Sequence, residues 1–217
     1  MTEADAWFDP YCRRCPRLVA LRERVSAEHP DYHAAPVPAF GAQRHRLLIV
    51  GLAPGMHGAN RTGRPFTGDY AGLLLYRVLH AVGLATRPVS ESAADGLRLK
   101  RTRITNAVKC LPPGNSPKGA EVAACNDFLA AELAGLPRGG VVLALGGVAH
   151  RAVLRALGLR QVAYPFGHGS DHALPGGERL VSSYHCSRYN TQTGRLTEAG
   201  FLQVMRHAAR AAGLPGR

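Results

Sequence analysis

A glycine-rich segment holds the first residues whose types and spacing could do chemistry. It reads GLAPGMHGANRTGRPFTGD over 51–69 and directly follows the apolar run RLLIV. Backbone amides and arginines can hold phosphates, and an aromatic ring such as Phe66 can stack on a flat base. The carboxylate of Asp69 could orient a water molecule or cap the helical pattern that follows it. The segment therefore suits a flat, polar, uncharged ligand beside a phosphate backbone.

Other uses of a glycine-rich loop do not fit the residues present. Gly58 and Gly63 have the glycine spacing of a P-loop, but Arg64 and Pro65 stand where a lysine and a serine or threonine are required. The segment also lacks the GxGxxG dinucleotide fingerprint, and no G-x-S-x-G nucleophile elbow occurs in the chain. Nucleotide hydrolysis and covalent serine chemistry are therefore not indicated.

Cysteines form the second group. Cys12 and Cys15 make a Cys-x2-Cys pair just before a helical pattern, and Cys110 and Cys125 lie 15 positions apart around the turn LPPGNSP. Four thiolates in a cytosolic protein more often hold a metal or a cluster than form disulfides. One tight and one loose pair fit zinc, a [4Fe-4S] cluster or plain buried cysteines. The fifth, Cys186, is interpreted as a small buried apolar side chain.

Alternating strands and helices must position these groups. Apolar runs predict strands over 46–52, 103–108, 141–145 and 179–184, and helical spacing predicts helices over 70–83, 118–135, 147–157 and 197–213. This order predicts an α/β fold with three αβα layers around a largely parallel sheet. Ligands of such sheets bind beyond the carboxyl ends of the strands. The segments that begin at Gly51, Asn106 and His185 are therefore expected to converge on one crevice.

Length and charge limit the class of protein. The 217 residues suit a single domain over 1–217, with a helical N-terminal appendage over 1–40. Lys and Arg outnumber Asp and Glu by 27 to 15, so the surface should attract polyanions such as nucleic acid. The alternative explanation of this charge is a genome rich in Arg codons, and we favour nucleic acid. No apolar run is long enough to span a membrane, and the first residues do not read as a signal peptide. We expect a cytoplasmic monomer.

Three separated motifs resemble one enzyme family. GLAPGMHGANRTGRPFTGD, NAVKCLPPGN with the following Cys125, and HCSRYNTQTGRLT are similar to the family 5 uracil-DNA glycosylases, the broad-specificity, iron–sulfur branch of the uracil-DNA glycosylase superfamily. The resemblance covers nearly the whole chain and implies a central four-stranded, largely parallel sheet between helices. It also implies a structural [4Fe-4S] cluster held by Cys12, Cys15, Cys110 and Cys125, the first two supplied by the N-terminal appendage.

The resemblance implies a DNA repair enzyme that hydrolyses the N-glycosidic bond of uracil, and of other deaminated bases, in DNA. The base is flipped from the duplex, and water attacks C1′ of the sugar. Better-known relatives carry an Asp, Glu or Asn in the first motif to position this water, whereas this chain has the family 5 pattern GLAPG. Asp69 is then the nearest carboxylate for water or for the cationic sugar. His185 would donate a hydrogen bond to the base carbonyl.

Further roles follow from matched positions. Phe66 matches the aromatic that stacks on the flipped base, and Asn106 matches the asparagine that reads the uracil edge. Several family 5 sequences have alanine in place of Asn106, so this residue bears on base specificity. Other expected substrate contacts, some of which could equally be loop or turn residues, are Gly51, Ala53, His57, Asn60 and Asn115. The expected contacts to DNA phosphates are Arg61, Arg64, Arg101, Arg103, Arg188 and Arg195.

Two other classes of protein remain open from the sequence. The missing acid in GLAPG leaves a non-catalytic iron–sulfur DNA-binding protein as the alternative, and four cysteines also suit a redox or electron-transfer protein. An enzyme would be monofunctional, because Lys109 is the only lysine in a matched motif and it stands next to Cys110. Release of uracil from DNA would separate the enzyme from the binding protein.

Overall fold

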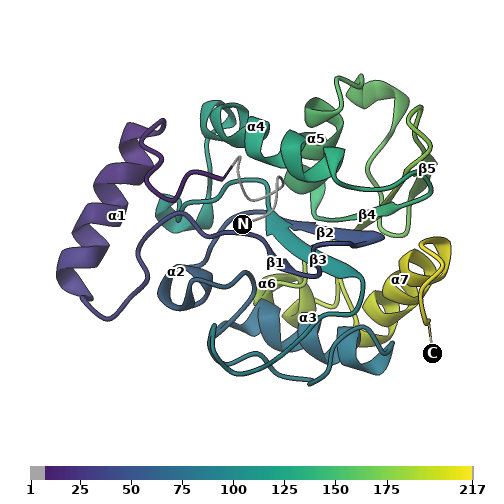
Figure 1. Cartoon of the computed structure of the whole chain (residues 1–217), viewed down its shortest axis with the longest axis horizontal. Coiled ribbons are helices and arrows are strands. Elements are labelled where there is room, and N and C mark those ends of the chain that lie inside the picture. The colour runs from purple at the N-terminus through teal and green to yellow at the C-terminus, as the bar shows by residue number, and fades with distance from the viewer. Residues whose placement is uncertain (1–7, 217) are drawn as a thin grey trace.

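The computed structural model describes residues 8–216, in which strands and helices alternate along the chain (Figure 1). The strands are β1 (Phe40–Gly41), β2 (Leu47–Gly51), β3 (Thr102–Asn106), β4 (Val141–Leu145), β5 (Asp171–Ala173) and β6 (Arg179–Ser183). The helices are α1 (Pro16–Glu28), α2 (Ala59–Thr62), α3 (Tyr70–Ala81), α4 (Gly119–Ala134), α5 (Gly147–Ala156), α6 (Arg188–Gln192) and α7 (Glu198–Ala211), with 3-10 turns η1 (Pro113–Asn115) and η2 (Gln161–Ala163). All predicted strands and helices are confirmed, with ends that differ by one or two residues.

The strands form one sheet in the order β1-β3-β2-β4-β6-β5. Its four central strands are parallel, as predicted, whereas β1 and β5 pair in antiparallel orientation with β3 and β6. The expected four-stranded sheet is therefore extended by one short strand at each edge. Strands of two and three residues are too short to show a repeating apolar pattern, so the sequence carried no evidence of them.

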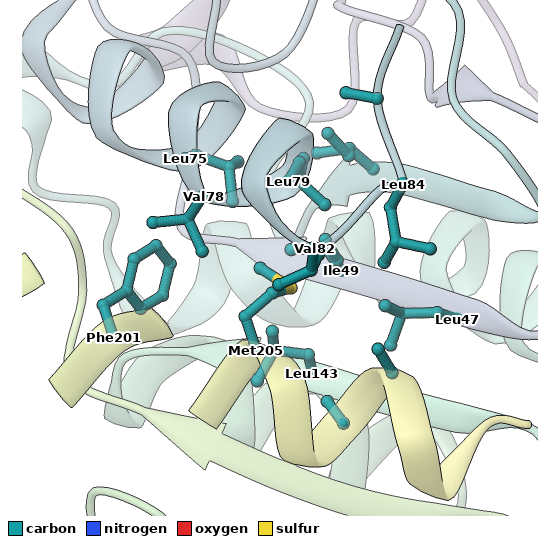
Figure 2. Close-up of a cluster of buried hydrophobic side chains, with 14 of the residues drawn as sticks. Leu47, Ile49, Leu75, Val78, Leu79, Val82, Leu84, Leu143, Phe201 and Met205 are labelled. Carbon is teal, nitrogen blue, oxygen red and sulfur yellow. The ribbon is translucent and has the colours of Figure 1, made fainter. Parts of the chain in front are cut away.

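Helices cover both faces of the sheet and confirm the three-layer αβα architecture. In Figure 1, α4 and α5 lie on one side of the central strands, and α3 and α7 lie on the other. Successive residues of β2 enter opposite cores, because Leu47 and Ile49 belong to the core with α3 and α7, and Leu48 and Val50 to the core with α4 and α5. Figure 2 shows the first core, with labelled side chains that include Leu75, Leu79, Phe201 and Met205.

The N-terminal part packs on the segment that leaves β3. Helix α1 begins at Pro16, in the first turn, where a proline costs no hydrogen bond. Its Leu18 contributes to a small apolar cluster with Val108 and Phe128. Residues 1–7 of the expected appendage over 1–40 lie outside the described residues. Within residues 8–216, every helix is too short or too polar to cross a membrane.

The parallel register brings the carboxyl ends of the central strands to one edge. Gly51 at the end of β2 is the register partner of Asn106 at the end of β3, and Leu145 of β4 is that of Ser183 of β6. The loops after these strands therefore start side by side. Two residues beyond Ser183 stands His185, so the fold brings together the segments that the sequence had singled out.

Candidate active site

Gly51, Phe66 and Asn106 meet at the carboxyl edge of the sheet. A Cβ atom on Gly51 would overlap Oδ1 of Asn106 and would stand 2.5 Å from Cζ of Phe66, so only glycine fits there. Asn106 is 3% exposed, and within residues 8–216 its Oδ1 has no hydrogen-bond partner. A buried acceptor without a partner costs about 1–3 kcal/mol, so it indicates a position that a ligand donor completes.

Phe66 is held in a left-handed backbone conformation with φ of 55°. A residue other than glycine costs roughly 1–3 kcal/mol in this region, and such strain persists only where the surrounding structure imposes it. The hydroxyl of Tyr76 donates to the carbonyl oxygen of Pro65 at 2.9 Å, and the hydroxyls of Thr67 and Ser90 lie 2.7 Å apart. Buried hydrogen bonds on both sides of Phe66 therefore fix the direction of its ring.

The imidazole of His185 lies beside the Phe66 ring. The ring centroids are 5.9 Å apart, and the planes are inclined by 28°. Burial lowers the pKa of His185 to about 4, so the ring is neutral at pH 7, with one nitrogen that donates and one that accepts. Asn190 of α6 donates to the carbonyl oxygen of His185 at 2.8 Å and holds this part of the backbone. The site thus offers a fixed neutral imidazole next to an aromatic ring.

Asp69 has two environments, one for each carboxylate oxygen. Its Oδ1 accepts a hydrogen bond from the backbone N–H of Gly72 at 2.9 Å, which confirms the helix cap expected at the start of α3. Its Oδ2 faces the glycine loop, where a Cβ on Gly55 would stand 3.2 Å away. Burial raises the pKa of Asp69. The cap uses one oxygen and leaves the other directed at the loop.

Three further candidates lie around the same loop but in different directions. The Nδ1 atom of His57 lies 2.8 Å from the hydroxyl of Tyr32, which draws this exposed ring toward the N-terminal part. Asn60 is 1% exposed and donates from its backbone N–H to Gly55. The Oδ1 atom of Asn115 lies 4.0 Å from the position of a Cβ on Gly55. The side chains of Asn115 and Asp69 therefore both lie close to Gly55.

A cavity of about 240 Å³ opens beside His185. Leu52, Tyr184 and Gly146 line it together with Arg195. The guanidinium of Arg195 lies 4.4 Å from the centroid of the Tyr184 ring, a stacking that restricts its position. The cavity is thus bordered by a neutral imidazole and by a positive charge.

The six candidate arginines do not form one surface. Arg61, Arg188 and Arg195 are exposed near the site, as phosphate contacts require. The expected phosphate contact of Arg103 is wrong, since this residue is 6% exposed within the central sheet. Arg101 is a second correction, because it precedes β3 and so lies at the amino end of the strand, opposite the site. The basic composition of this part of the chain could not show which end of the strand faced the site.

Arg64 is a third correction, because it is a buried structural residue. It is 4% exposed, and its Nη1 lies 2.7 Å from Oδ1 of Asp95 and 3.0 Å from the hydroxyl of Ser90. Its guanidinium also lies 4.2 Å from the centroid of the Phe40 ring. Arg64 therefore supports the segment that carries Phe66 and does not face DNA.

The four candidate ligand cysteines come together. Cys12, Cys15, Cys110 and Cys125 line one small cavity, whose walls also include Leu18, Val108 and Phe128. Burial is the first cause, and neighbouring thiolates are a further cause, of a pKa of about 12 for Cys110 and about 11 for Cys125. Within the described residues, no three His, Cys, Asp or Glu side chains are arranged as ligands of one metal ion. Ala53, an expected substrate contact, packs against the apolar cluster formed by Leu18, Val108 and Phe128.

Two residues next to the matched positions are buried, Cys186 and Lys109. Cys186 is completely buried in the core with α3 and α7, as its interpretation as an apolar side chain predicts. Lys109 is 1% exposed, and its Nζ donates to both carboxylate oxygens of Glu132 at 2.9 Å and to the hydroxyl of Thr105. Sequence reasoning missed this ion pair because Glu132 lies on α4, and only the helical phase of α4 could have placed it inward.

Comparisons with known proteins agree with this geometry. Residues 38–209 match the family model described as the uracil DNA glycosylase superfamily. The chain is 51% identical over 208 residues to the type-5 uracil-DNA glycosylase of Thermus thermophilus, with 94% of each chain covered. It is 43% identical over 218 residues to the type-5 enzyme of Pyrobaculum aerophilum, covering 95% of this chain and 94% of that one. A type-4 uracil-DNA glycosylase of Archaeoglobus fulgidus is 35% identical over 130 residues, 58% of this chain and 57% of the relative. This chain belongs to the uracil DNA glycosylase superfamily.

Proposed function

We propose that this protein is a monofunctional DNA repair glycosylase that releases uracil, and other deaminated bases, from DNA. The observation that carries the proposal is the close approach of Phe66 and Asn106 at Gly51, with His185 beside the Phe66 ring. An aromatic face, an amide edge and a neutral hydrogen-bond donor are the three contacts that a flipped base needs. The similarity to type-5 uracil-DNA glycosylases supports the same activity.

The flipped base stacks on Phe66 and is read at its edge. The buried Oδ1 of Asn106 accepts a hydrogen bond from N3–H of uracil, and the amide nitrogen donates to O4. The imidazole of His185 lies beside the phenyl ring, with the two planes inclined by 28°, so a base on Phe66 would be close to His185. Because His185 is neutral, it donates a hydrogen bond to the carbonyl oxygen on which negative charge develops as the bond to C1′ breaks.

The carboxylate of Asp69 acts on the sugar side of the bond. Its Oδ2, directed at the glycine loop, orients the attacking water or stabilises the cationic sugar, while Oδ1 keeps its bond to Gly72. Asn115 stands beside the same loop and is placed to hold this water or the backbone. Breaking the bond without an enzyme amine yields an intact abasic strand. The burial of Lys109 against Glu132 supports this outcome, since a paired, buried ammonium cannot form a Schiff base.

We further propose that Cys12, Cys15, Cys110 and Cys125 hold a structural [4Fe-4S] cluster. Each iron of such a cluster takes one thiolate, so its ligands surround more space than the four ligands of one zinc ion. The four cysteines line the same small cavity, as the ligands of one cluster must. The iron charge would offset the burial that otherwise keeps Cys110 and Cys125 protonated. The ligands join α1 to the segment after β3, so the cluster would act as a cross-link.

Single-turnover base release tests the proposed activity. Oligonucleotides that carry uracil, hypoxanthine or xanthine, single- and double-stranded, are incubated with excess protein, and both free base and strand breaks are measured. We expect released uracil with intact abasic strands. Strand breaks formed without added base or heat would contradict a monofunctional mechanism. Tight binding without release of any base would favour the non-catalytic DNA-binding protein.

A further inference from the structure

A groove between α4 and α5 lies next to the candidate active site. Its volume is about 330 Å³, and its walls include Gly119 at the start of α4 and Val148, Arg151 and Arg155 of α5. Val148 also lines the cavity beside His185. The two hollows therefore share a wall, and the groove leads away from the site along α5.

The two arginines of this groove are exposed and available for a ligand. Among the described residues, neither the Arg151 nor the Arg155 side chain has a hydrogen bond or ion pair. Among residues 8–216, no acidic residue lines the groove. The nearest carboxylate along α4 is that of Glu121, which accepts hydrogen bonds from the Arg17 guanidinium and from the Lys118 backbone. The groove is thus a positive surface without an internal counter-charge.

The spacing along α5 suits a polymer of phosphates. Positions 148, 151 and 155 fall on one helix face, because they are separated by three and four residues. The two arginines are roughly 6 Å apart along the helix axis at 1.5 Å per residue, a length in which one strand of DNA carries about two phosphates. The opposite face of α5, with Ala149 and Val153, is buried in the core. The helix therefore presents the arginines from a rigid support.

We infer that this groove binds the phosphodiester backbone of the DNA on one side of the flipped nucleotide. The inference rests on the proposed function, which brings DNA to the adjacent cavity. Arg64 and Arg103 are buried and Arg101 is distant, so these three residues cannot contact DNA at the site. The two exposed arginines of the groove can. Arg195 beside His185 and the two arginines of α5 then follow one strand away from the lesion.

Salt dependence of binding tests this surface directly. Binding to duplexes with a central abasic site is measured from about 50 to about 200 mM salt for the wild type and for the Arg151→Ala/Arg155→Ala variant. Each lost phosphate contact flattens the log–log slope by about 0.9, so the double variant should lose up to about 1.8. The Arg151→Lys/Arg155→Lys variant keeps the charge and should retain most of the slope. Lys100→Ala/Arg101→Ala is the matched control, since both residues are exposed and precede β3 at the opposite edge.

The length of the DNA provides a second measurement. Abasic duplexes are extended by about three nucleotides on the 5′ or on the 3′ side of the lesion. The wild type should gain affinity from extension on one of the two sides, and the Arg151→Ala/Arg155→Ala variant should lose that gain. An unchanged salt slope in this variant, or an equal loss in the Lys100→Ala/Arg101→Ala control, would overturn the inference. Uracil release by the wild type is measured beside binding, so a wild type that binds without release would refute the proposed function separately.

Discussion

The carboxylate of Asp69 occupies the space that a side chain at Gly58 would need. A Cβ on Gly58 would stand 2.8 Å from Cγ of Asp69, although one residue belongs to the loop after β2 and the other caps α3. The absence of a side chain at Gly58 therefore allows the Asp69 carboxylate to lie against the loop. This contact places the Asp69 carboxylate against the glycine loop that contains GLAPG.

Substitution of Asp69 by Asn separates its two roles. Asparagine caps a helix about as well as aspartate but carries no charge. We expect Asp69→Asn to keep the thermal midpoint and to slow single-turnover uracil release at least tenfold. Asp69→Ala should slow release equally and should also lower stability by about 1 kcal/mol, through loss of the bond to Gly72. Release at the wild-type rate in Asp69→Asn would show that Asp69 acts only as a helix cap.

Asn106→Ala should change the ranking of lesions. The amide complements the uracil edge, and a base group left without its partner costs about 1–3 kcal/mol, or about 5- to 150-fold. Uracil should therefore lose more rate than hypoxanthine or xanthine in single-turnover assays. Gly51→Ala is the contrasting variant, because its new methyl group fills the space between Asn106 and Phe66. It should abolish release of every base while binding to abasic DNA survives. Equal losses on all lesions in Asn106→Ala would contradict its role in reading the base.

His185 should make the protein less stable in acid. Its folded pKa is about 4, below its ordinary 6.5, so between these values the unfolded chain binds a proton that the folded protein does not. Stability is therefore retained above pH 6.5 and decreases as pH falls toward 4, by up to about 3 kcal/mol at roughly 1.4 kcal/mol per unit. Urea unfolding at several pH values should show a weaker dependence in His185→Asn than in the wild type. Parallel curves for the two proteins would show that His185 titrates normally.

The cysteine assignment predicts a coloured protein. Anaerobically purified protein should contain iron and inorganic sulfide in equal amounts and should absorb broadly in the visible range, which zinc thiolates do not. Cys12→Ala and Cys110→Ala should lose the colour and lower solubility, because each removes one ligand from the shared cavity. Cys186→Ala is the control and should keep the colour, since this residue lies in the core with α3 and α7. A colourless wild type with stoichiometric zinc would refute the cluster.

Arg64→Ala should act on stability and not on the salt dependence of DNA binding. The substitution removes the charged partner of Asp95, which keeps its backbone hydrogen bonds from Glu91 and Leu97, so the loss should cost about 1–3 kcal/mol. The midpoint of urea unfolding should fall accordingly. Arg61→Ala is the comparison, because that side chain is exposed near the site. It should flatten the salt slope by about 0.9 with little change in stability. A reduced salt slope in Arg64→Ala would show that Arg64 contacts DNA phosphates.

The amino-acid sequence by itself determined the elements and the residues at their ends. Apolar runs and helical spacing depend on neighbours within a few residues, so β2, β3, β4, β6 and the four long helices could be predicted. The rule that parallel strands place ligands at their carboxyl ends then singled out Gly51, Asn106 and His185. The Asp69 cap was also predictable, because a cap uses the backbone of its own helix.

Tertiary structure alone decided how side chains were used. Arg61 and Arg64 stand three positions apart in one basic loop, yet only Arg64 is buried, because Asp95 arrives beside it from a distant segment. The close packing at Gly51 likewise depends on Phe66 and Asn106, which reach it from two different segments. Charge pairing and close approach are set by distances between remote parts of the chain, and local sequence patterns do not contain those distances.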